Sequence, residues 1–256
     1  MGDINVSHKD GILDIELNRP NKKNALTFAM YETLVETLRS ASTDQAVRVV
    51  LLSAEGDTFC AGNDIGDFLS SPGLDPVTAP PMRFIEELIR FEKPLVAAVQ
   101  GAAVGIGTTM LLHADLVYAD ESAKFSLPFV GLGLVPEAGS SLLLPRRIGQ
   151  AAANDLLLRG SVMSAARALE VGLVNEIAPP DLRVVRFARS RAADVASRPP
   201  RAVRATKALL RGDRDELLAC ARREAAEFAA SVGSDEASEA FTAFMERRAP
   251  DFSKFT

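Results

Sequence analysis

The sequence contains only two cysteines among its 256 residues, and it has no excess of basic residues. Cys60 and Cys220 are too few for a disulfide scaffold or a zinc site built from several thiolates. A formal net charge of −5 argues against nucleic acid as the main partner. The N-terminus carries no apolar signal core, and no uncharged apolar run reaches membrane-spanning length. We therefore expect a cytoplasmic protein with neither a nucleic-acid nor a membrane partner.

Sequence motifs that bind nucleotides are also missing. Neither GxGxxG nor GxxxxGK[ST] occurs, so the sequence supports neither a dinucleotide fold nor a P-loop. The two histidines, His8 and His113, lack the setting of a triad histidine and are expected to be surface or satisfied residues. What remains is an ordinary globular composition, with 47% hydrophobic and 25% charged residues, which can bury a sizeable core.

Strand-like and helix-like runs alternate along most of the chain, which favours an α/β fold. The pattern predicts a hairpin turning at Asp10-Gly11, a helix over 27–42 with Thr27 as its N-cap, a helical stretch near 104–113, and buried strands at 47–53, 95–99 and 116–119. From about residue 179 alanine, arginine and glutamate dominate, and Pro199-Pro200 and Gly212-Asp213 divide this part into at least three helices. We expect an α/β core over 1–195 and a helical region over 196–256.

Three glycine-bearing loops follow predicted strands, at residues 59–65, 101–107 and 131–141. Glycine lets a backbone approach a ligand closely, and a loop that enters a helix offers free N–H groups. Each loop taken alone is more typical of a structural turn. Two of them side by side could hold a developing negative oxygen between two amides.

Taken together, the segments AEGDTFCAGNDIGDF, KPLVAAVQGAAVGIGTTMLLHADLVYAD and AKFSLPFVGLGLVPEAGSSLLLPRRIG resemble the crotonase superfamily, the enoyl-CoA hydratase/isomerase family. The opening LNRPNKKNAL and the tail FTAFMERRAPDF fit as well, so the resemblance covers essentially the whole chain. It implies a spiral of ββα units, a helical C-terminal trimerisation region and an acyl-CoA thioester as ligand. It also implies that the backbone N–H groups of Asn63 and Ile106 hold the thioester oxygen, with no metal and no cofactor beyond the coenzyme A of the substrate.

The resemblance also suggests which reaction the site performs. Family members that hydrate a double bond carry two glutamates, and Thr109 and Phe129 stand at those positions here. Glu137 matches the single base of the Δ3,Δ2-enoyl-CoA isomerases, for which one carboxylate suffices. Apolar neighbours should raise the pKa of Glu137. The alternative for Glu137 is a first-turn glutamate favoured by the helix dipole.

Further residues match places that contact the substrate or coenzyme A in the family: Lys22, Ala25, Ala61, Asp64, Ile65, Phe129, Phe244 and Arg247. Several of them have plainer interpretations. Asp64 is typical of a loop cap, Phe244 of core packing beside Phe241, and Arg247 of a solvated face. Cys60 is interpreted as packing.

Alternative interpretations stay open for segment 70–82 and for the function. The proline-rich segment 70–82 is either a connector or a wall of a binding site, and Asp67 and Asp75 are expected to be solvated. A Δ3,Δ2-enoyl-CoA isomerase is the main hypothesis. The alternatives are a hydratase or another reaction of CoA thioesters, and a non-catalytic CoA-binding protein.

The C-terminal helices also generate a prediction about assembly. Leu209, Leu217, Phe228 and Phe244 would leave apolar stripes exposed on a monomer, and such patches mark interfaces. We expect a homotrimer or a dimer of trimers. Light scattering at micromolar concentration checks this, and the mass of a monomer would contradict it.

Overall fold

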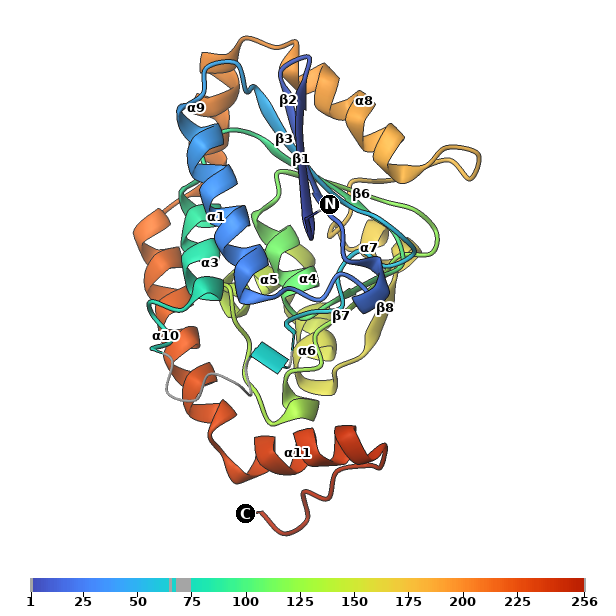
Figure 1. Cartoon of the computed structure of the whole chain (residues 1–256), viewed down its shortest axis with the longest axis vertical. Helices are drawn as coiled ribbons and strands as arrows, with labels where there is room; N and C mark the ends of the chain where they lie inside the picture. Colours follow the sequence, from blue (N-terminus) through green and yellow to red (C-terminus); the bar gives the residue numbers. More distant parts are fainter. Residues whose placement is uncertain (1, 65, 68–74, 256) are drawn as a thin grey trace.

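The computed structural model describes residues 2–64, 66–67 and 75–255 (Figure 1). Its largest sheet has the order β1-β2-β3-β4-β6-β9, formed by Ile4–Lys9, Ile12–Leu17, Val49–Ala54, Leu95–Val99, Leu116–Ala119 and Glu176–Ile177. Strands β1 and β2 form the predicted hairpin, and the other neighbours in this sheet pair in parallel. The three predicted buried strands are confirmed within two residues.

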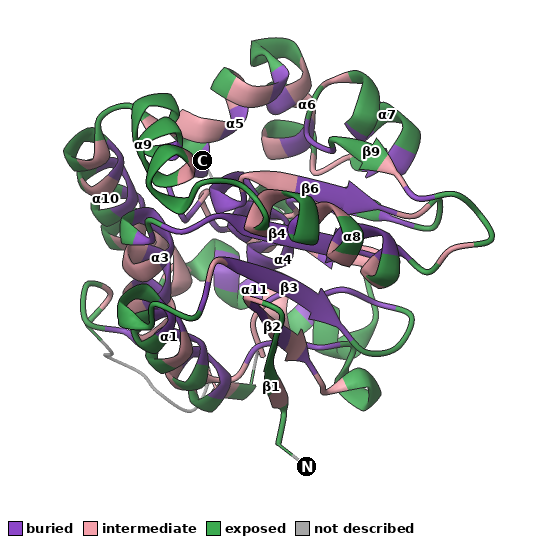
Figure 2. Ribbon diagram, turned by 90° about the horizontal axis from the view of Figure 1, so that it is seen from above, coloured by how far each residue is buried: buried purple, intermediate pink, exposed green. Residues whose placement is uncertain are grey.

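Both faces of this sheet are covered, which explains the continuous apolar runs in its central strands. Every residue of β3 is buried, and its side chains alternate between two apolar clusters. Val49 and Leu51 pack toward α8 (Val184–Ala196), and Val50 and Leu52 pack toward the main core. Helices α1 (Phe28–Thr43) and α3 (Pro80–Arg90) belong to that core, and Thr27 caps α1 as predicted. Figure 2 shows the buried strands enclosed between these helices.

A second, smaller sheet has the order β5-β7-β8, formed by Ala102–Val104, Lys124–Ser126 and Val162–Ser164. Short helices occur between the strands along the chain: η1 (Pro20–Lys22), α4 (Ile106–Thr109), η2 (Met110–His113), η3 (Val130–Leu132), α5 (Ser140–Ile148), α6 (Gln150–Arg159) and α7 (Ala165–Glu170). The predicted helical stretch near 104–113 is therefore α4 followed directly by η2. Because β5 leads into α4 through Gly105, this small sheet places the second glycine loop next to the first.

Three helices complete the chain: α9 (Pro200–Arg211), α10 (Arg214–Val232) and α11 (Asp235–Glu246). Helix α9 is fastened to the core by Lys207, whose ammonium donates to the Lys93 carbonyl at 2.6 Å and to the Asp115 carboxylate at 2.7 Å. Helix α10 then packs against α3 and α5. No helix among the described residues is both long enough and apolar enough to cross a membrane.

The expected apolar stripe of the C-terminal helices is confirmed only in part. Leu209 and Phe244 are 85% and 60% exposed. The expectation is wrong for Leu217, which is buried, and for Phe228, which is half-buried against the core. Both lie on α10, where Leu217 packs beside Gly139 and the Phe228 ring packs edge-on to Phe129. The trimer stays a prediction, with Leu209 and Phe244 as the exposed part of the stripe.

Candidate active site

The first two glycine loops lie side by side, as the sequence predicts. Cys60 forms a parallel bridge with Ala103, in which its N–H donates to Ala102 and its carbonyl accepts from Val104, at 3.0 and 2.9 Å. Gly107 allows this approach, because a Cβ there would lie 2.5 Å from the Cys60 carbonyl oxygen. The bridge therefore fixes the distance between the two loops.

Both loops present backbone N–H groups with no acceptor among the described residues: those of Asn63 and its neighbour Gly62 in the first loop, and those of Ile106 and its neighbour Gly107 in the second. Leu26 explains the first: its N–H donates to Gly62 and its carbonyl accepts from Asp64, so the Asn63 N–H faces the other way. Ile106 is the first residue of α4, where N–H groups have no partner within the helix. The side chain of Asn63 is also held, because the Tyr31 hydroxyl donates to its amide oxygen.

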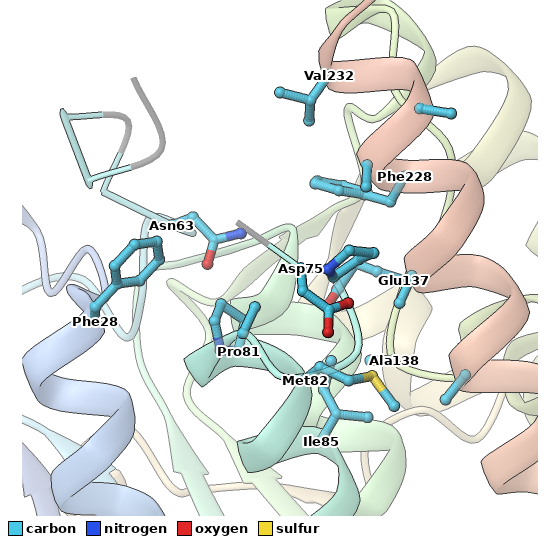
Figure 3. Close-up of a pocket in the computed structure, with 16 residues that line it drawn as sticks. Phe28, Asn63, Asp75, Pro81, Met82, Ile85, Glu137, Ala138, Phe228 and Val232 are labelled. Carbon is cyan, nitrogen blue, oxygen red and sulfur yellow. The ribbon is translucent and has the colours of Figure 1, made fainter. Parts of the chain in front are cut away.

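The third glycine loop brings Glu137 to the same place. Glu137 and Asn63 both line a cavity of about 500 Å³ (Figure 3). Asp75 is exposed, as the sequence predicts, and it lines this cavity too. The other lining side chains are apolar and come from α1, the segment before α3, α3, the third glycine loop and α10: Phe28, Pro76, Ala79, Pro81, Met82, Ile85, Ala138, Ala221, Ala225, Phe228, Ala229, Ala230 and Val232.

Glu137 is a buried carboxyl group outside any helix. Helix α5 begins three residues later at Ser140, so the interpretation of Glu137 as a first-turn residue is wrong. The hydroxyl of Thr109, the last residue of α4, donates to the Glu137 carboxylate. Burial raises the pKa of Glu137 to about 8; the bond from Thr109 opposes this rise, and the nearby charge of Glu224 adds to it. The predicted direction of the shift is confirmed, and a carboxyl tuned in this way is suited to exchange protons near neutral pH.

The residues expected to contact coenzyme A near the first loop are brought together. The Ala61 N–H donates to the Lys23 carbonyl at 3.0 Å, which joins the loop to the segment that carries Lys22 and Ala25. Asp64 accepts from Arg19 at 2.7 Å and from the Gly66 N–H at 2.9 Å, so its loop-capping interpretation is confirmed. Ile65 lies outside the described residues.

The remaining expected contacts lie apart from one another. Phe129 is buried, with its ring edge-on to Phe228 at a centroid distance of 6.4 Å. Phe244 and Arg247 lie at the end of α11 and do not line the cavity of this chain. The interpretation of Phe244 as a core residue is wrong, because its side chain is exposed. A role for these two residues in binding coenzyme A stays a prediction.

Other candidate groups are buried and inert. Burial raises the pKa of the Cys60 thiol to about 12, which agrees with its interpretation as packing. Burial lowers the pKa of His113 to about 3, and the ring bonds the Ala138 carbonyl at 2.8 Å. No group of three or more histidine, cysteine or acidic side chains in the described ranges could hold a metal ion.

Several residues of the site were missed in the sequence. Tyr31 lies on the apolar face of α1, where a tyrosine is easily read as core, although a buried hydroxyl requires a partner. Ala221, Ala225 and Ala229 recur every four residues along α10, which places them on one face toward the cavity. Of the segment 70–82, residues 70–74 lie outside the described residues, and several residues of 75–82 form a wall of the cavity.

Comparison with known proteins agrees with this arrangement. The family model "Enoyl-CoA hydratase/isomerase" matches residues 7–254. The chain belongs to this family. A crystal structure of an enoyl-CoA hydratase/isomerase from Pseudoalteromonas atlantica T6c is 44% identical, with a TM-score of 0.92, and the match covers 98% of this chain and all of that chain. The crotonase-type fold is therefore shown.

Two curated relatives within the family carry different activities in their names. The chain is 38% identical over 251 residues to rat "Enoyl-CoA delta isomerase 2", covering 96% of this chain and 64% of that protein. It is 33% identical over 253 residues to "2,3-dehydroadipyl-CoA hydratase" of Escherichia coli, covering 98% of this chain and 99% of that protein. Family membership thus leaves isomerisation and hydration as separate possibilities.

The raised pKa of Glu137 predicts a pH-dependent stability. The unfolded carboxyl loses its proton near its ordinary pKa of 4.5, and the folded one only near 8, so the folded state binds the proton more tightly between these values. The free energy of unfolding should therefore lose a contribution as pH rises from about 4.5 to 8. The Glu137→Gln variant has no carboxyl at this position and does not lose this contribution. The difference in melting temperature, variant minus wild type, should therefore increase from pH 4.5 to 8 and stay constant above pH 8. A constant difference from pH 4 to 9 would contradict the burial argument.

Proposed function

We propose that this protein moves the carbon–carbon double bond of a 3-enoyl-CoA thioester to the 2-position, with Glu137 as the one base. The observation that carries the proposal is a buried carboxyl of raised pKa that lines the same cavity as Asn63. The carboxylate takes a proton from C2, the electrons pass into a dienolate, and the resulting carboxylic acid returns the proton to C4. The proton removed and the proton returned balance, so neither water nor a second acid is required.

The backbone N–H groups of Asn63 and Ile106 supply the stabilisation of negative charge that the base alone cannot. Proton loss at C2 places negative charge on the thioester oxygen, and preorganised donors stabilise that charge. Asn63 and Ile106 offer such donors from loops held together by the Cys60 bridge. One such donor is typically worth about 3–4 kcal/mol of transition-state stabilisation. Coenzyme A enters as part of the substrate, and the step uses no further cofactor.

The local environment favours isomerisation over hydration. At the two positions where hydratases of the family carry glutamates, Thr109 is bonded to Glu137 and Phe129 packs against Phe228. Neither side chain exchanges a proton near neutral pH. The name of the Escherichia coli relative keeps hydration as the second candidate function.

A protein that only binds coenzyme A explains the site less well. An ionised carboxyl group in a buried, largely apolar setting is unfavourable, which is why the pKa of Glu137 is raised. Binding alone gives no reason to retain that carboxyl beside the cavity. Turnover of purified protein separates the two readings.

The choice between isomerase and hydratase predicts a ratio of two rates. Purified protein should convert 3-enoyl-CoA to 2-enoyl-CoA, and it should add water to 2-enoyl-CoA at least about 100-fold more slowly, since a positioned proton donor is worth roughly that factor. Both rates are measured on esters of matched chain length. Comparable rates would assign the protein to the hydratases and remove the isomerase proposal.

Glu137→Gln tests the base directly. The amide is nearly isosteric, so the loop should keep its shape, but it cannot accept the C2 proton. We expect kcat for isomerisation to fall at least about 100-fold. Affinity for a non-reactive acyl-CoA, measured by calorimetry, should change little because the backbone donors remain. A kcat within a few-fold of the wild type would remove Glu137 from the mechanism.

A further inference from the structure

A second buried carboxylate, Glu224, lies near the proposed base Glu137. Glu224 projects from α10 and accepts the N–H of Gly139 and, at 2.9 Å, the N–H of Ser141. The Ser141 hydroxyl also donates to it, and the Cys220 thiol lies 3.6 Å from the same oxygen. Among the described residues four donors face this side chain, and a carboxylate accepts such bonds. The reaction proposed above gives Glu224 no role.

The bonds from Glu224 fall on the part of the chain that orients Glu137. Ala138 and Gly139 both have left-handed backbones, with φ of 62° and 71°, and they turn the chain between Glu137 and α5. An L side chain rarely adopts that conformation, so Ala138 stays there only because its surroundings hold it. Glu224 holds the turn from one side through Gly139.

The opposite side of the same turn is held by His113. Its Nε2 lies 2.8 Å from the Ala138 carbonyl oxygen, and its pKa of about 3 makes the ring neutral, so Nε2–H is the donor in this bond. His113 is buried within η2, which follows α4 directly. The turn is therefore fixed between η2 of the core and α10 of the C-terminal helices.

We propose that Glu224 is a positioning residue for Glu137: by holding the amides of Gly139 and Ser141, it fixes the 138–139 turn and so aims the Glu137 carboxyl into the cavity. The inference rests on the proposed function only for what Glu137 does once it is in place. Its consequence is that α10, which also forms a wall of the cavity, sets the direction of the base.

The charge of Glu224 has a second effect on the same group, since it adds to the rise in the pKa of Glu137. Four other polar groups near Glu137 carry no charge. Burial keeps the Tyr31 phenol and the Cys60 thiol protonated, His113 is neutral, and Thr109 is a hydroxyl. Asp75 is the further acidic group that lines the cavity. Removal of the Glu224 charge should therefore lower the pKa of Glu137.

Glu224→Gln tests the inference, with Glu227→Gln as the matched control. Glu227 is exposed on the same helix and holds no amide of the turn among the described residues, so its variant makes the same change of charge without releasing the turn. Titration of the Glu137 carboxyl by ¹³C NMR in the intact protein needs no substrate. We expect the midpoint to drop in Glu224→Gln and to stay unchanged in Glu227→Gln. An unchanged midpoint in both variants would overturn the inference.

The kinetic readout separates positioning from mere stabilisation of the fold. In Glu224→Gln, kcat should fall at least about tenfold with KM within about threefold, because the base is misaimed while the cavity remains. The lower limb of the pH–rate profile should move to lower pH together with the carboxyl midpoint. A lower melting temperature with kcat and the pH profile unchanged would mean that Glu224 only stabilises the fold, and the inference would fall.

Two further variants decide the case if Glu224→Gln does not fold. Glu224→Asp keeps the charge but shortens the reach, so the carboxyl midpoint should stay raised while kcat falls. Ser141→Ala removes one donor and should lower kcat by a few-fold. Wild-type rates in both variants would overturn the inference. Absence of isomerase turnover in the wild type would overturn the proposed function instead, since the NMR titration still reports whether Glu224 acts on Glu137.

Discussion

The close contact between residues 57–63 and 101–107 is the constraint on which the site depends. Gly101 and Gly107 allow it: a Cβ would lie 1.8 Å from the Asp57 carbonyl oxygen at the first position and 2.5 Å from that of Cys60 at the second. Side chains at either position would push the segments apart. The bridge between Cys60 and Ala103 would then break, and the segments that carry the Asn63 and Ile106 N–H groups would separate. The rest of the fold serves to hold this contact in register.

Around that contact, hydrogen bonds hold the polar side chains of the site in place. Asn63 is fixed through its side chain by Tyr31, and Glu137 is fixed by Thr109 from α4. Both bonds lie in surroundings where an unsatisfied polar group would be costly, so each bond has few alternatives and specifies one geometry. The third glycine loop is thus joined to the second by a side chain and to the C-terminal helices by Glu224. A single connected arrangement spans segments that are far apart in the sequence.

Much of the fold could be predicted because local patterns carry it. The Asp10-Gly11 turn, the Thr27 cap and the doubly covered strand β3 follow from turn chemistry, capping and hydrophobic run length. Glu137 was found from its motif, but the sequence pattern also allowed a place in the first turn of a helix. The left-handed backbone at Ala138 and Gly139 delays α5, and no propensity rule anticipates such a backbone at an alanine.

The groups that sequence reasoning missed depend on contacts between distant segments. Leu217 was expected on an exposed stripe, because helical spacing shows that a face is apolar but not which element covers it. Tyr31 and Glu224 sit on helices whose patterns are ordinary, and their importance comes from partners 32 and 85 residues away in the chain. A pattern within one helix cannot reveal a partner at that separation.

The alanine face of α10 has a consequence for how relatives of this chain diverge. Ala221, Ala225 and Ala229 leave room that a larger side chain at any one of them would occupy, while the loops that carry Asn63, Ile106 and Glu137 lie on other segments. A single substitution on α10 can therefore resize the chamber and leave the proton-transfer machinery untouched. The width of the cavity and the proposed proton transfer therefore depend on different residues, although α10 carries some of both.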